Sequence, residues 1–262
     1  MKLGMPALIE YSNLEENLRL CKELELDFIE LNMNYPIFMP ESFSYEEVRS
    51  IKKEYHIDFT AHLPEEIDLT SFHPSIRKGH LERCKELIRW TSLADIKIVN
   101  MHINNGIHCT LPYKRQWINE TYELEFRKLL FESYSELNNL ANSLGVILCI
   151  ENTSNFHIPF IQRALEMLSS FDNFNLTWDV GHDAKANFNE KPVLLRFKDR
   201  IKHMHLHDFN NNSDHQPLYT GIIPIDDRLS FAKANNISVV IEVKTSEALK
   251  ESVNKLRAFI QI

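Results

Sequence analysis

Seven acidic or histidine residues recur near the ends of short apolar runs, and their types match the ligands of divalent metals. They are Glu30, His62, His102, Glu151, Asp179, His205 and Glu242, in the segments FIELN, FTAHLP, VNMHINNG, ILCIENT, LTWDVGHD, KHMHLHD and VVIEVKT. A buried ring of carboxylates and imidazoles repels itself and is costly to desolvate. A divalent cation neutralises the carboxylates and uses imidazole nitrogen as a ligand, so this set predicts a buried metal centre.

These side chains can converge only if the runs that carry them are neighbouring strands. The strand-like runs are Leu3–Leu8, Phe28–Leu31, Asp58–Ala61, Ile96–Met101, Val146–Ile150, Leu176–Trp178, Ile201–Leu206 and Val239–Val243. Between them lie stretches with apolar residues at helical spacing, namely Asn13–Leu26, Glu46–Tyr55, Ser75–Leu93, Thr121–Leu144, Pro159–Phe171, Lys191–Phe197, Asp227–Asn235 and Ser246–Ile260. Strands that alternate with helices predict a parallel sheet. Eight such units in 262 residues favour a single α/β domain over 1–262, closed into a (β/α)₈ TIM barrel, over a doubly wound open sheet.

Alternation along the strands indicates which side chains enter the barrel. Asp179 falls on the opposite face from Trp178, and Glu242 on the opposite face from Ile241. We expect the apolar face to pack on the helices and the polar face to point inward. In such barrels active sites form at the C-terminal mouth, so the metal centre is predicted there.

Three histidines alternate along one predicted strand, as His203, His205 and His207. One histidine per strand fits at a given level, so two of the three are expected behind the site or at the surface. Glu30 can equally form a structural ion pair. The remaining histidines outside the motifs are expected to be ordinary helix or loop residues, and these are His56, His73, His80, His108 and His157.

Composition and charge narrow the classes of function. The chain is 44% hydrophobic and 25% charged, which is ordinary globular composition. A net charge of −8 weighs against nucleic acid as a partner, because a basic patch supplies most of that affinity. The four cysteines form no CxxC pair, which predicts free thiols rather than a zinc ribbon. No GxGxxG or GxxxxGK[ST] segment is present, so a glycine-rich phosphate cradle is not expected.

The chain shows no signal for export or for membrane insertion. The first ten residues hold no basic region followed by a long apolar run, and no stretch of about 18 apolar residues occurs. We therefore expect a cytoplasmic protein without a membrane partner, in a compartment that keeps thiols reduced.

Taken in order, these motifs resemble those of the xylose isomerase-like TIM-barrel superfamily. That superfamily includes sugar isomerases and epimerases, and also the endonuclease IV group of AP endonucleases. The segments that carry the resemblance are AHLPEEIDLTSFHPSIRKGHLERCKELI, VNMHINNG, IENT, DVGHD, HLHD, DHQPLYTG and IEVK, and they extend over nearly the whole chain. The resemblance implies that four residues are the shared metal ligands, namely Glu151, Asp179, His205 and Glu242.

Further ligands follow from the endonuclease IV side of this resemblance. His62 and His102 match histidines that help hold a second zinc there, and His182 and His215 match ligands of a third zinc. His182 also matches a substrate-contacting histidine of the sugar epimerases. Ser213 stands where the endonuclease pattern has aspartate, so a third metal requires Asp214 to reach the site.

Two reaction classes follow. In the first, the chain is a sugar or sugar-phosphate isomerase or epimerase, whose divalent metal acts as a Lewis acid on a carbonyl. Glu151 and Glu242 would then move the proton as a base and acid pair, and related dehydratase chemistry is a sub-case. The substrate is a small carbohydrate, and the residues expected to contact it are His62, His102, His182 and Lys244.

The alternative is an endonuclease IV-like zinc phosphodiesterase acting on abasic DNA. The additional histidines favour it, whereas the acidic charge, Ser213 and the lack of a basic stripe beyond Lys114 and Arg115 oppose it. A third class is a non-catalytic barrel with a structural metal, which would show saturated coordination. The ligand set suits Mn²⁺, Mg²⁺, Co²⁺ or Zn²⁺ and does not choose among them. A homodimer is possible, but no interface can be identified in the sequence.

Overall fold

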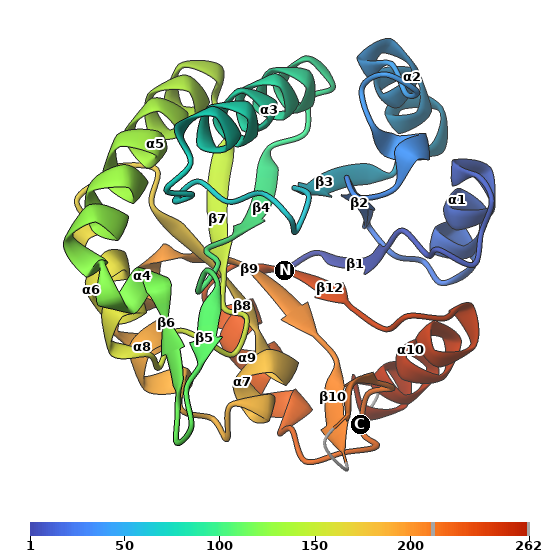
Figure 1. Cartoon of the computed structure of the whole chain (residues 1–262). Helices are drawn as coiled ribbons and strands as arrows, with labels where there is room; N and C mark the ends of the chain where they lie inside the picture. Colours follow the sequence, from blue (N-terminus) through green and yellow to red (C-terminus); the bar gives the residue numbers. More distant parts are fainter. Residues whose placement is uncertain (211–212, 261–262) are drawn as a thin grey trace.

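A closed barrel of parallel strands surrounded by helices makes up the fold (Figure 1). It is seen in a computed structural model that describes residues 1–210 and 213–260. The barrel strands are β1 (Leu3–Pro6), β2 (Phe28–Asn32), β3 (Asp58–His62), β4 (Ile98–His102), β7 (Ile147–Glu151), β8 (Asn175–Asp179), β9 (Ile201–Leu206) and β12 (Ser238–Ile241). They follow the order β1-β12-β9-β8-β7-β4-β3-β2 and close on themselves. The predicted TIM barrel is confirmed, and the open sheet is excluded.

The helices that follow the barrel strands lie on the outside of the barrel (Figure 1). They are α1 (Leu14–Glu23), α2 (Tyr45–Tyr55), α3 (Pro74–Leu93), α5 (Glu123–Leu144), α6 (Pro159–Leu168), α8 (Lys191–Arg196), α9 (Ile225–Ala234) and α10 (Ser246–Ile260). Local signals set several of their ends. Ser44 and Glu47 form a reciprocal capping box at the start of α2. Gly145 ends α5 in the left-handed conformation, at φ 66°, which glycine adopts without a steric penalty.

The barrel wall separates an apolar outer face from a polar inner face, as the alternation predicted. On the outer face Trp178 is 1% exposed, and Met204 and Leu206 are fully buried against the helices. On the inner face Asp179 and His205 are also fully buried. Polar groups at zero exposure need partners, so the interior of the barrel must hold a network of charges.

The structure corrects the predicted boundaries by a few residues. Strands β3, β4, β7 and β8 each run one residue further than expected, so His62, His102, Glu151 and Asp179 are the last residues of their strands. The helix expected over Thr121–Leu144 is interrupted at Tyr122, which separates α4 (Ile118–Thr121) from α5. Such ends depend on packing between strands, which the local sequence does not encode.

Two hairpins and one short helix lie in segments for which the sequence predicted neither a strand nor a helix. The hairpins are β5 (His108–Thr110) with β6 (Arg115–Trp117) and β10 (Asp208–Asn210) with β11 (Ser213–Gln216). The helix is α7 (Val180–Lys185), which is too short to show helical periodicity in the sequence. Positions 211 and 212, between β10 and β11, lie outside the described residues. No helix over 1–210 or 213–260 is long and apolar enough to cross a membrane.

Candidate metal centre

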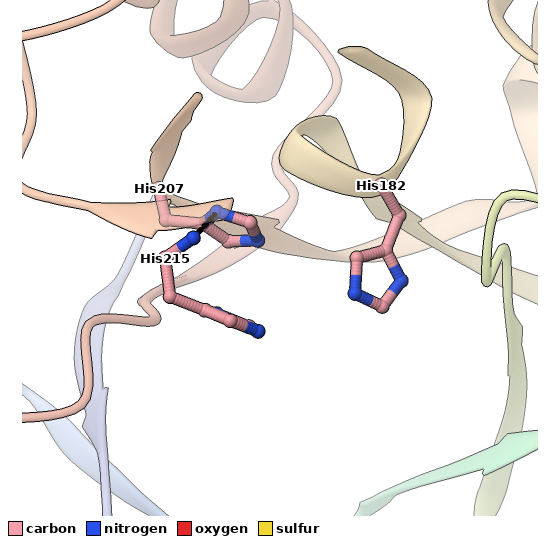
Figure 2. Close-up of side chains that lie close together, drawn as sticks. All are labelled: His182, His207 and His215. Carbon is pink, nitrogen blue, oxygen red and sulfur yellow. Dashed lines mark hydrogen bonds between the residues drawn. The ribbon is translucent and has the colours of Figure 1, made fainter. Parts of the chain in front are cut away.

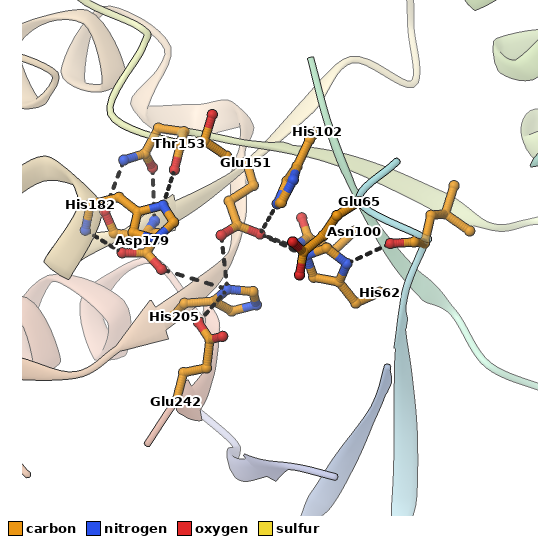
Figure 3. A network of polar contacts seen from close by, with 12 residues as sticks. His62, Glu65, Asn100, His102, Glu151, Thr153, Asp179, His182, His205 and Glu242 are labelled. Atoms are coloured by element: carbon orange, nitrogen blue, oxygen red, sulfur yellow. Dashed lines mark hydrogen bonds and ion pairs between the residues drawn. The ribbon is translucent and has the colours of Figure 1, made fainter. Parts of the chain in front are cut away.

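The strand ends lie in register at the C-terminal mouth. His102 pairs with Glu151 across β4 and β7, and Asp179 pairs with His205 across β8 and β9. Glu242 follows directly after β12, whose Ile241 pairs with Leu206. Parallel strands that end at one level therefore bring side chains from distant parts of the chain into one group (Figure 3).

His205 is the centre of the group formed by Glu151, Asp179, His205 and Glu242 (Figure 3). Its Nδ1 atom lies 3.2 Å from Oε1 of Glu151, 3.0 Å from Oε2 of Glu242 and 3.9 Å from Oδ2 of Asp179. One donor atom from each residue falls within 4.8 Å of all the others. The structure thus brings together the four residues that the sequence predicts as ligands.

Hydrogen bonding within this group is incomplete. In the described part of the chain, both buried ring nitrogens of His205 and buried Oε2 of Glu242 make no hydrogen bond of acceptable geometry. Orphaned polar atoms are rare in buried positions, and an ion is one of their ordinary explanations. Three carboxylates and one imidazole nitrogen form a donor set that suits a divalent cation, so the buried cluster indicates a metal site.

The charges of this group depend strongly on one another. Burial alone would raise the pKa of Glu151, but His205 and His102 outweigh it and lower that pKa well below its ordinary value. Burial alone would lower the pKa of His205, but Glu151, Glu30 and Glu242 raise it well above its ordinary value. Protons therefore hold the cluster together in the metal-free protein. A cation that binds there takes the place of those protons.

His62 and His102 flank the outer side of Glu151. Nε2 of His62 lies 3.2 Å from Oε2 of Glu151, and Nε2 of His102 lies 3.4 Å from the same oxygen. Asn100 donates a hydrogen bond from Nδ2 to that oxygen as well. Burial would lower the pKa of His62, but its bond to Glu151 raises the pKa to about 9. These histidines lie where the resemblance placed them, as a second group of potential ligands.

His182 and His215 lie on the opposite side of the mouth, beside His207 (Figure 2). The rings of His207 and His215 stack with their centroids 4.2 Å apart. Ser213 is exposed, and Oδ2 of Asp214 lies 3.9 Å from Nε2 of His182 but 2.9 Å from the ammonium of Lys185. Asp214 therefore approaches this group but is an ion-pair partner of Lys185.

Of the two places expected for His203 and His207, behind the site or at the surface, the structure excludes the surface. Both are fully buried. Strand β9 has a barrel neighbour on each side, so its inward positions are covered at every depth. Oε2 of Glu30 lies 3.0 Å from Nε2 of His203 and Oε1 lies 2.9 Å from Nε2 of His205, so Glu30 is a buried partner of two histidines. The HxHxH alternation already indicated that all three histidines share the inner face.

Two residues that sequence reasoning passed over anchor the loops around the mouth. Asn152 accepts from the backbone N–H of Asp179 at 2.8 Å and donates to its carbonyl at 2.9 Å, which ties the ends of β7 and β8 together. Asp208 accepts from the N–H groups of Thr220, Gly221 and Ile223. Their positions in IENT and HLHD, directly after a strand, were the available signal.

The approach to Glu242 passes through a small cavity of about 50 Å³. Among the residues that line it are Tyr35, Glu65, Glu242 and Lys244. The ammonium of Lys244 lies 2.8 Å from Oε1 of Glu242, and the Lys244 side chain is 56% exposed. A cation that faces solvent next to the cluster is suited to contact an anionic or hydroxyl-rich ligand.

The sequence of this chain is similar to those of known proteins. A family model described as xylose isomerase-like TIM barrel matches residues 18–259. An uncharacterised protein of Methanocaldococcus jannaschii is 24% identical over 271 residues, spanning 100% of both chains.

Several solved structures share the fold at low sequence identity. A D-tagatose 3-epimerase-like protein has a TM-score of 0.80 at 21% identity, covering 100% of this chain and 97% of that one. The apo form of a 3-keto-D-glucoside 4-epimerase from E. coli has a TM-score of 0.75 at 18% identity, covering 100% of both chains. The IOLI protein, solved with a zinc atom, also has a TM-score of 0.75 at 18% identity, covering 98% of this chain and 97% of that one. From the family match, this chain belongs to the xylose isomerase-like TIM-barrel family.

Proposed function

We propose that this member of the xylose isomerase-like TIM-barrel family is a divalent-metal-dependent sugar or sugar-phosphate isomerase or epimerase. One observation carries the proposal. The carboxylates of Glu151 and Glu242 come from different strands and approach the same nitrogen of His205, at 3.2 and 3.0 Å. Two carboxylates around one cation site provide a base and an acid for moving a proton on the carbon next to a carbonyl.

The residues that would hold the cation are Glu151, Asp179, His205 and Glu242. When bound, the cation supplies Lewis-acid polarisation of a substrate carbonyl. Burial alone would raise the pKa of Glu242, but His205 and Lys244 lower it well below its ordinary value. Glu242 is therefore a carboxylate at neutral pH and is ready to accept a proton.

The two glutamates differ in how firmly they are held. Oε2 of Glu151 contacts Asn100, His62 and His102, and its side chain is 3% exposed. Glu242 is 15% exposed, and its Oε2 has no hydrogen-bond donor among the described residues. We therefore assign the proton transfer on the solvent side to Glu242, and the transfer on the deeper side to Glu151.

The substrate in this proposal is a small carbohydrate. Lys244 stands at the mouth, where it can pair with a phosphate or a hydroxyl. His182 projects from the start of α7 toward the same mouth, and His62 and His102 lie beside Glu151 (Figure 3). The zinc in the IOLI structure supports zinc as one of the usable metals, and Mn²⁺, Mg²⁺ and Co²⁺ suit the same donor set.

The test is solvent proton exchange into a panel of keto sugars in deuterated water, with the protein loaded with each metal in turn. We expect incorporation of deuterium next to the carbonyl, and its loss in both Glu151→Gln and Glu242→Gln. Metal content is measured on each variant, so that loss of proton transfer is separated from loss of metal. Retained exchange in both metal-loaded variants would remove the acid and base assignment.

A second candidate is the endonuclease IV-like phosphodiesterase. It is favoured by His62 and His102, which lie beside Glu151 as a separate potential ligand group. Two or three zinc ions per chain, with cleavage of an abasic duplex that chelation abolishes, would establish it. No cleavage by fully zinc-loaded protein would eliminate it.

We also propose that the protein is cytoplasmic and that it forms a homodimer. A cytoplasmic location keeps the four free cysteines reduced. Tyr113 is fully exposed and Leu111 is 43% exposed at the tip of the β5–β6 hairpin, where a second copy of the chain could cover them. Light scattering on purified protein decides between monomer and homodimer.

A further inference from the structure

His207 is the third histidine of β9's HxHxH pattern, just beyond the end of the strand, and it admits two roles. It offers a nitrogen within 4.8 Å of nitrogens of His182 and His215, as three ligands of one metal would (Figure 2). It also contacts the carboxylate of Asp179. A ring nitrogen can bind a metal only with a free lone pair, so the position of the ring proton separates these roles.

The contacts of His207 indicate which ring nitrogen carries that proton. Nδ1 lies 2.8 Å from the backbone nitrogen of His215 (Figure 2) and 3.3 Å from the carbonyl oxygen of Asp208. The backbone N–H of His215 can only donate and is the closer of the two groups, so we assign Nδ1 as an acceptor that carries no proton. The ring proton is then on Nε2. Nε2 lies 3.1 and 3.2 Å from the two oxygens of Asp179, and an ionised carboxylate can only accept. Both nitrogens of His207 are therefore occupied.

We propose that His207 is a positioning residue that holds the carboxylate of Asp179 toward the metal centre, and that it is not itself a ligand. The inference rests on the metal centre of the proposed function. Asp179 also accepts from the backbone N–H of His182 at 2.6 Å, so its Oδ1 is held from two directions. Partners behind a ligand that fix its orientation commonly change metal affinity when they are lost.

Gly181 supports this role independently. A Cβ built on Gly181 would lie 1.8 Å from Cε1 and 2.2 Å from Nδ1 of His207. The imidazole therefore occupies the space that any other side chain at position 181 would need. The glycine of DVGHD and the second histidine of HLHD fit each other, and together they determine where the Asp179 carboxylate points.

His182 and His215 differ from His207 in this respect. Their Nδ1 atoms lie 3.3 Å from the carbonyl of Asn152 and 3.0 Å from the carbonyl of Glu242, so each donates its proton there. Their Nε2 atoms keep a free lone pair. A second ion on this side of the mouth would bind these two histidines without His207.

The experiment measures zinc affinity by competition with a chromogenic chelator, together with zinc count per chain, on wild-type and variant protein. His207→Phe keeps the ring shape beside Gly181 and removes both nitrogens. We expect it to weaken the tightest zinc site roughly 10- to 100-fold and to leave the number of zinc ions unchanged. His207→Gln keeps a donor for Asp179, and it should restore affinity to within about threefold of wild type.

His73→Phe is the control, because it replaces an exposed histidine that lies outside the mouth and makes no side-chain capping bond. It should leave the affinity of the tightest site and the zinc count unchanged. The inference is overturned if His207→Phe leaves the affinity of the tightest site unchanged, or if it lowers the zinc count by one.

Nitrogen-15 NMR of the histidine rings keeps the inference testable if a variant does not fold. In wild-type protein without metal, His207 should carry its proton on Nε2, and the proton should stay there when zinc is added. Protonation on Nδ1, or loss of the Nε2 proton on zinc addition, contradicts the assignment. Wild-type protein that binds no zinc, manganese or cobalt would instead refute the proposed function, whatever tautomer His207 shows.

Discussion

The carboxylate of Glu30 lies 2.9 Å from Nε2 of His205, on the side of the imidazole opposite Nδ1. To bind a cation together with Glu151 and Glu242, Nδ1 must present its lone pair, so the proton of the neutral ring must then lie on Nε2, next to Glu30. Glu30 is therefore placed to stabilise the ligating tautomer of His205 from behind, as the outer carboxylates of many metal sites do.

Glu30→Gln should therefore weaken metal binding. The amide has one acceptor oxygen, whereas the carboxylate has contacts to His205, His203 and Thr60, and its negative charge is lost. We expect a fall in zinc affinity of roughly tenfold or more, measured by chelator competition. Thr60→Val is the control, because it removes one hydrogen bond to Glu30 and leaves the contact with His205. Equal affinities in wild type and Glu30→Gln would contradict this role.

Metal should stabilise the folded protein, because the carboxylate ring is not preformed in the unfolded chain. At a metal concentration of about 100 times Kd the gain is about 2.7 kcal/mol. For a domain of this size the melting temperature changes by roughly 2–4 °C per kcal/mol. Differential scanning fluorimetry with and without chelator measures it. Asp179→Asn should reduce the gain, and an unchanged gain in that variant would place the metal elsewhere.

The metal-free protein should lose stability as the pH rises above neutrality. The pKa of His62 is raised from 6.5 in the unfolded chain to about 9 by Glu151, against the opposing effect of burial. A raised pKa contributes stability that is complete below pH 6.5 and is lost as the pH passes through about 9. In chelator, the melting temperature should fall over this range.

The His62→Gln variant is the control for this pH dependence, and its melting curve should be flatter between the same limits. Saturating zinc should also flatten the curve of the wild type, because the cation replaces the proton. A metal-free melting temperature that rises over this range would contradict the raised pKa of His62.

Gly181→Ala should destabilise the protein through one contact. The new Cβ would lie 1.8 Å from Cε1 of His207, and the fully buried ring has little room to move. Overpacking of this kind costs about 1–3 kcal/mol, measurable by denaturant unfolding. The double variant Gly181→Ala with His207→Ala should recover part of that loss. Strictly additive effects of the two changes would argue against the contact.

Much of the fold and of the candidate metal centre could be predicted from local sequence. Side chains alternate along a strand with a period of two, so Asp179, His205 and Glu242 were expected to share the inner face. Eight repeated strand and helix patterns were enough to predict closure of the sheet. Both patterns depend on residues close together in the sequence. Because all strands of such a barrel are parallel, the prediction then placed their C-terminal ends at one mouth.

The roles of the three histidines of HxHxH were decided only by the tertiary structure. Their rings lie at different depths in the barrel, and each ring contacts a different partner. His203 meets Glu30, 173 residues away in the sequence; His205 meets the carboxylates of the mouth; and His207 meets Asp179. Whether an imidazole is a ligand or holds a ligand depends on where its single proton lies. The groups on both sides of the ring determine which nitrogen carries that proton, and only the closed barrel brings those groups together.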